Sequence, residues 1–108
     1  MDTLSFLDAN DSVFIATLDG TQYRLRMLWN DAGGFWTLSL RTPAGTALLE
    51  GVKVVPNYAL LKPYHRPGIP PGELLVITDD TIQTVGRKDF ADGTATLVYV
   101  TEDEVDAI

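Results

Sequence analysis

The chain of 108 residues contains no cysteine, one histidine and only eight lysines and arginines. Without cysteine it can form neither a disulfide framework nor a thiolate metal site. The net charge is −7, and the few basic residues are scattered. Binding of nucleic acid needs clustered Lys and Arg to neutralise phosphates, so nucleic acid is not expected as a partner. The acidity serves solubility or attracts basic partners, and the composition does not choose between the two.

Long apolar runs and cofactor motifs are also missing. No stretch approaches the length of about 18 apolar residues that a membrane-spanning helix needs, so no membrane contact is expected. The first eleven residues have neither a basic start nor a long apolar run and are not expected to be a signal peptide. No phosphate-binding or dinucleotide-binding fingerprint occurs, and Asp8–Asp11 lacks the glycine and the final glutamate of a calcium loop. The sequence therefore predicts no cofactor and no metal.

What the chain does have is enough apolar residues, 45%, for a core of its own. At this length it is expected to be a single β-domain, residues 1–108. Residues 1–11 are expected to form an N-terminal arm or edge strand. Residues 101–108, with four acids, are expected to form an acidic C-terminal tail, either frayed or in a short helical turn.

The stretch Tyr23–Leu40 organises the rest of the chain. Apolar and polar residues alternate from Tyr23 to Trp29 and again from Trp36 to Leu40, as in strands with one buried face. The residues between them, Asn30–Gly34, favour a turn. The sequence therefore predicts a hairpin whose inner face carries both tryptophans and much of the core.

Further strands follow from the same pattern and from turn residues. Ser12–Leu18 is rich in β-branched and aromatic residues, and its apolar groups on both faces predict a strand covered on both sides. Asp19–Gly20 after it predicts a two-residue hairpin turn. The other expected strands are Thr46–Leu49 and Val52–Val55, separated by a bend at Gly51, then Glu73–Thr78, Thr81–Val85 and Thr94–Val100, with Arg87–Gly93 as a charged loop. The fold class predicted is all-β, a small antiparallel β-barrel or sandwich of about 7–9 short strands.

The segment Lys62–Gly72 holds four of the six prolines and is the one long irregular stretch. Proline cannot donate a ladder hydrogen bond, so a surface loop of extended character is predicted. Long loops in compact domains tend to carry contacts or function. The loop contains the only histidine, and the residues expected to contact a partner are Tyr64, His65, Arg66, Pro67 and Ile69.

No residues form a convincing catalytic set. His65 is a lone histidine in a proline-rich loop, whereas a catalytic triad also needs a nucleophile and an orienting group. The carboxylate pairs Asp79–Asp80 and Asp89/Asp92 lie at strand ends, where aspartate is a common turn residue. Tyr64, Phe35 and Phe90 are expected either to form an aromatic binding surface or, for the two phenylalanines, to complete the ends of the core.

Taken together, the order of these segments resembles the baseplate plug family of contractile-tailed phages, of the cyanophage type. The resemblance covers about Ser12 to Val100, with tryptophan before the first turn where tyrosine is usual. The matching positions are Trp29–Asn30, Trp36, Gly45 with Leu48 and Gly51, Leu60–Leu61, Pro71–Gly72 with Leu74, and Leu97–Tyr99.

This resemblance implies a structural protein of the virion without a catalytic role. It would occupy the tail baseplate near the central hub and spike, in several copies around the tail axis, after assembly in the host cytoplasm. Its partners would be hub, spike, tail tube or wedge subunits, contacted through the proline loop, the N-terminal arm and the acidic tail. The alternatives are a small β-sandwich that binds carbohydrate or peptide through Tyr64 and His65, and an enzyme.

Overall fold

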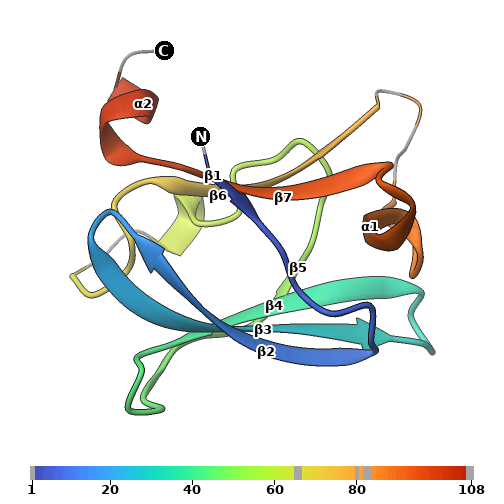
Figure 1. Ribbon diagram of the computed structural model, residues 1–108, viewed down its shortest axis with the longest axis horizontal. Coiled ribbons are helices and arrows are strands. Elements are labelled where there is room, and N and C mark those ends of the chain that lie inside the picture. The colour runs from blue at the N-terminus through green and yellow to red at the C-terminus, as the bar shows by residue number, and fades with distance from the viewer. Residues whose placement is uncertain (1, 65–66, 80, 82–83, 107–108) are drawn as a thin grey trace.

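The computed structural model describes residues 2–64, 67–79, 81 and 84–106. Figure 1 shows two sheets that face each other as layers. The three-stranded sheet has the order β1-β7-β6 and the four-stranded sheet the order β2-β3-β4-β5, and all pairs are antiparallel. The strands are β1 (Asp2–Leu4), β2 (Asp11–Leu18), β3 (Thr21–Asn30), β4 (Phe35–Arg41), β5 (Ala47–Lys53), β6 (Glu73–Thr78) and β7 (Ala95–Val100). Three short helices complete the described elements: η1 (Lys62–Tyr64), α1 (Asp89–Asp92) and α2 (Glu102–Asp106).

The predicted all-β class is confirmed, and the two architectures left open are now separated. The two sheets stay distinct in their hydrogen bonding and do not close into a barrel. They enclose one core between them, as in a sandwich (Figure 1).

The central hairpin has the predicted strands and the predicted buried face. Trp29 of β3 lies opposite Trp36 of β4 at the turn end, with ring centroids 5.4 Å apart. The Asp19–Gly20 turn is also as predicted, since both residues adopt positive φ, +51° and +81°. The buried side chains come from both layers: Leu18, Tyr23, Leu25, Met27, Trp36, Leu38 and Leu40 from one sheet, and Leu74, Val76, Ala95, Leu97 and Tyr99 from the other.

Three predicted segments differ in the structure. The two runs around Gly51 form one strand, β5, because a bulge with Gly51 at φ +65° absorbs the break. The charged loop Arg87–Gly93 contains α1, which Gly93 ends in the left-handed conformation. Of Thr81–Val85, the described residues 81, 84 and 85 are not in a strand.

The outer face of β2 is not covered by the described part of the chain, although apolar groups on both faces led us to expect cover on both sides. Val13 is 57% exposed and Ile15 58% exposed, whereas Leu18 on the inner face is buried. Strand β2 therefore carries more apolar side chains than the core buries.

Candidate partner-contact surface

The predicted contact residues do not share one surface. Tyr64 ends the single turn η1 with 37% of its surface exposed, and Pro67 is also exposed. Ile69 is 7% exposed and belongs to the core, so its side chain contacts the protein itself. His65 and Arg66 lie outside the described residues. Of the predicted contact residues that the structure describes, Tyr64 and Pro67 are therefore the exposed ones.

Both ends of the proline loop are fixed to the three-stranded sheet. At its start, the backbone N–H of Leu61 donates to the buried Glu73 carboxylate at 2.9 Å, and that of Leu60 donates to the Leu74 carbonyl at 3.0 Å. At its end, Gly72 lies so close to β7 that an added Cβ would be 2.0 Å from the Val100 carbonyl oxygen. Only glycine fits this approach, so the loop leaves and rejoins the sheet at fixed points.

One buried phenol joins three segments at this end of the molecule. The Tyr99 hydroxyl accepts a hydrogen bond from the Gly72 N–H at 2.8 Å and donates to Asp19 Oδ2 at 2.5 Å. Asp19 Oδ2 also accepts from the Glu102 N–H at 3.0 Å, where α2 begins. Burial, together with the hydrogen bond to Asp19, raises the pKa of Tyr99 far above its usual value, so the hydroxyl stays protonated. The β2–β3 turn, the proline loop and α2 are thereby held together.

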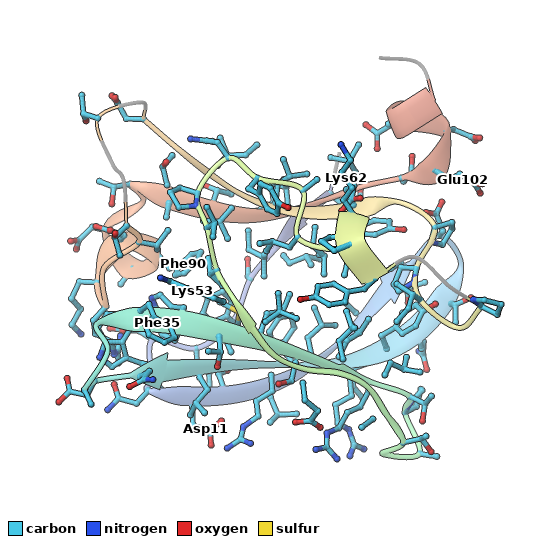
Figure 2. All side chains as sticks on the ribbon, turned by 180° about the vertical axis from the view of Figure 1, so that it is seen from behind. Asp11, Phe35, Lys53, Lys62, Phe90 and Glu102 are labelled. Atoms are coloured by element: carbon cyan, nitrogen blue, oxygen red, sulfur yellow. The ribbon has the colours of Figure 1, made fainter. Side chains whose placement is uncertain are left out.

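We call this region the proline-loop end: Asp19–Gly20, the described residues of 62–72, and Glu102–Glu104. Figures 1 and 2 both place η1 and α2 at the same end of the sandwich, and Figure 2 shows Lys62 and Glu102 there. Lys62, Glu102 and Asp103 are exposed. The surface therefore combines an exposed aromatic ring and proline with charges of both signs, a composition typical of a protein contact rather than of a catalytic cleft.

The N-terminal arm, also expected to contact a partner, is tied to the chain's own surface. The Asp8 carboxylate accepts from Arg87 at 2.5 Å and from Lys88 at 3.0 Å, and Asn10 Oδ1 accepts from Arg87 at 2.5 Å. The hydrogen bonds from Arg87 and Lys88 lower the pKa of Asp8. Phe6 stacks on Phe14 with centroids 5.6 Å apart, so the arm closes one side of the sandwich.

Aromatic residues gather at the opposite end. A hollow of about 240 Å³ lies there, lined by the arm, Trp36, Arg87 and Phe90. Phe90 packs edge-on against Trp36 at 5.6 Å and completes the core, as one of the two alternatives predicted. Phe35 lies under the ammonium group of Lys53, 5.0 Å from its centroid (Figure 2). Tyr64 is at the other end, so the three aromatics do not form one binding surface.

Two of the candidate acid–base residues, Asp89 and Asp79, hold the backbone of the chain in place. Asp89 Oδ2 accepts from the Gly86 N–H at 2.6 Å and its Oδ1 from the Thr94 hydroxyl at 3.0 Å, which fixes the ends of α1. Asp79 Oδ1 accepts from the Thr81 N–H at 3.0 Å in a turn, and Asp80 lies outside the described residues. Within the described ranges, no three His, Asp or Glu side chains are placed to hold a metal ion.

Sequence reasoning missed Asp19, Gly72 and Tyr99 as a connected group. The Asp19–Gly20 pair was interpreted only as a turn, and Tyr99 only as part of the last strand and of the family pattern. No local signal reveals their contact, because Asp19 and Tyr99 are 80 residues apart. Among the described helices, none is long and apolar enough to cross a membrane.

A family model described as "Cyanophage baseplate Pam3 plug gp18" matches residues 1–102 of the 108-residue chain. No curated protein matches the sequence. The match spans both sheets, the arm and the proline loop, and so covers all the contacts described above.

Proposed function

The chain belongs to the cyanophage baseplate plug family, and from this premise we propose that it fills the axial region of the tail tip beside the hub and spike. It is a structural protein of the virion, in the baseplate of the tail. In our proposal several copies surround the tail axis and act by assembly contacts alone, without catalysis. They are assembled in the host cytoplasm.

We propose the proline-loop end as the surface that contacts hub, spike, tail tube or wedge subunits. The observation that carries this proposal is that both ends of the exposed loop are held in place. Tyr64 stands on a turn whose two flanks are hydrogen-bonded to buried groups of β6 and β7. A surface that is ordered before binding loses less conformational entropy when a partner docks, and aromatic residues often supply the strongest contacts.

The experiment is site-specific photo-crosslinking in assembled tails. A photoreactive phenylalanine analogue replaces Tyr64 in one variant, and Ala32 in the control variant. Ala32 is exposed in the β3–β4 turn, at the opposite end of the sandwich (Figure 1). We expect the probe at position 64 to attach to another baseplate protein, identified by mass spectrometry, and the probe at position 32 not to do so.

Two results would overturn parts of this proposal separately. Adducts from position 32 but none from position 64 would reject the contact surface and leave the axial location untouched. A cryo-electron microscopy map of the intact tail that places this chain away from the axis would reject the location.

A further inference from the structure

We propose that the free edge of β2 pairs with β2 of a second copy, which joins two four-stranded sheets into one. This inference goes beyond the proposed place in the baseplate and does not depend on it. It rests on the exposed hydrogen-bonding groups of β2, on its apolar outer side chains and on the fit of the strand to itself.

Three of the four sheet edges in the described part of the chain are protected. Segment 56–60 runs along β6, with a parallel bridge from Pro56 to Val76 and hydrogen bonds from Asn57 and Leu60 to carbonyls of β6. Strand β1 has only three residues. Strand β5 is bulged at Gly51 and carries two charged residues. Short edges, bulges, charges and covering segments are the usual protections against unwanted strand pairing.

Strand β2 is neither short nor bulged, and Asp11 is its one charged residue. The N-terminal arm packs on its inner face, where Phe6 stacks on Phe14. The strand is eight residues long and pairs in unbroken register with β3. Within the described residues, no backbone hydrogen bond reaches its outer edge. Figure 1 shows β2 as the outermost strand of its sheet. A long and regular edge without backbone partners is a template for another strand.

The hydrogen-bonding pattern identifies the groups on this edge. Leu18 and Thr21 close a two-residue hairpin, and the Trp29 N–H donates to the Asn10 carbonyl, so the even-numbered residues of β2 bond to β3. The odd-numbered residues therefore direct their N–H and C=O groups outward. These are Asp11, Val13, Ile15 and Thr17, and all four are exposed.

These four residues match a second copy of themselves in one antiparallel register. When Val13 faces Ile15 of the second copy, Asp11 faces Thr17, and all four outward residues of each strand are paired. A shift of two residues in either direction leaves one of them without a partner and loses the two Val–Ile pairs. Side-chain pairs across neighbouring strands stabilise a sheet, so the register that keeps both Val–Ile pairs is favoured. On the inner side, Phe14 and the Phe6 ring stacked on it come beside the same two rings of the second copy across the two-fold axis.

Charge does not oppose this pairing locally, although each copy carries −7. Asp11 is the one acidic residue of β2, and both its carboxylate oxygens accept from Arg26, at 2.8 and 2.7 Å. Figure 2 shows Asp11 on the outer side of the four-stranded sheet, away from the core. Leu7, 75% exposed, lines a shallow hollow together with Val13 and extends the apolar surface beside the strand.

The first test measures self-association of the full chain by analytical ultracentrifugation from about 1 μM to about 1 mM, a range that covers weak and moderate affinities. We expect a monomer–dimer equilibrium. The double variant Val13→Lys/Ile15→Lys places charges in the pairing face and should raise the dimer Kd by about tenfold or more. Ile77→Lys is the matched control, because Ile77 is also an exposed strand residue but lies on β6, whose edge is covered. The control should leave the Kd unchanged.

The second test determines which residues of the two β2 strands lie opposite each other, and it needs no variant that weakens the dimer. Since the chain lacks cysteine, Val13→Cys and Ile15→Cys variants can be made without background thiols. Opposite residues in such a pair have Cα atoms about 5.5 Å apart, within the range that a disulfide spans. A mixture of the two variants should form crosslinked dimers faster than either variant alone. A chain that stays monomeric throughout, an equal effect of Ile77→Lys, or preferential crosslinking of one variant to itself would each overturn the proposal.

Discussion

Trp36 is the largest fully buried side chain in the described part of the chain. It is 1% exposed, stands between Trp29, Phe6 and Phe90, and donates from Nε1 to the Gly86 carbonyl at 3.0 Å. We expect Trp36→Ala to lower the free energy of unfolding by about 3–5 kcal/mol, since burial is lost and a cavity remains. Urea denaturation measures this change.

The neighbouring Phe35→Ala provides the comparison. Phe35 is only half-buried and its ring contacts the exposed end of Lys53, so the loss should be clearly smaller. A loss below about 1 kcal/mol for Trp36→Ala would contradict the buried position of the indole.

The sequence predicts the surroundings of some residues in the fold but not of others. The buried positions of Trp36 and Leu38 follow from alternation, which is a local property of a strand. The position of Ile69 does not, because the loop bends back into the core and buries an apolar residue that its proline-rich surroundings mark as exposed. The link from Gly72 through Tyr99 to Asp19 depends on three distant segments that meet only in the folded chain.

At the level of elements, segment 56–60 acts as a substitute strand for β6. Asn57 holds it in place with φ +56° and with side-chain hydrogen bonds to the Thr78 backbone and hydroxyl at 3.1–3.3 Å. We expect Asn57→Ala to lower the free energy of unfolding by about 1–3 kcal/mol, because it loses these bonds and strains a left-handed backbone. Hydrogen exchange at the Leu60 N–H should become faster in the same variant.

Asn57→Gly separates the two causes. Glycine adopts positive φ without strain, so this variant loses only the side-chain bonds and should be less destabilised than Asn57→Ala. Equal losses in the two variants would show that strain contributes nothing. An unchanged exchange rate at Leu60 in both would show that Asn57 does not hold the segment on β6.

The elements that the sequence predicts well are those made by neighbours in the chain. Hairpins β2–β3 and β3–β4 have both a turn signal and alternating strands, and both form with the expected strands and turns. Helix α1 was missed because four residues are too few to show a helical period. The two strands predicted on either side of Gly51 are one strand, because a bulge lets the strand continue through the glycine.

For the whole molecule, acid should weaken the ion pairs of the N-terminal region. Hydrogen bonds from Arg87 and Lys88 lower the pKa of Asp8, and those from Arg26 lower the pKa of Asp11. A carboxylate with a lowered pKa contributes stability above its unfolded value, and this contribution is lost as the pH falls through the folded value. We therefore expect the melting temperature to fall below about pH 5, as the unfolded carboxylates near pKa 3.8 begin to take up protons.

The double variant Asp8→Asn/Asp11→Asn should have a lower melting temperature than the parent at pH 7. Its melting temperature should also fall less between pH 5 and pH 3, and circular dichroism measures both changes. Asp103→Asn, on the exposed start of α2, makes the same kind of charge change as a control. A parent and double variant with parallel melting curves across this pH range would contradict the role of the two aspartates.

Local sequence patterns do not predict how the strands are divided between the two sheets. The first strand, β1, pairs with the last, β7, and the partition into three and four strands follows from contacts across almost the full length of the chain. Alternation predicts which residues of a strand are buried, but it does not identify the neighbouring strand. For this reason barrel and sandwich remained equivalent until the structure separated them.

The pairing of β1 with β7 also has a mechanical consequence. Asp2 lies opposite Tyr99, so the chain enters β1 and leaves β7 at the same end of the sheet. A force that pulls these two points apart loads the β1–β7 ladder one bond at a time, as in unzipping, rather than shearing all its bonds together. Tension between the chain ends should therefore peel β1 away from β7 at low force. A force applied to the β3–β4 hairpin should need to be higher, because these two strands carry buried core side chains.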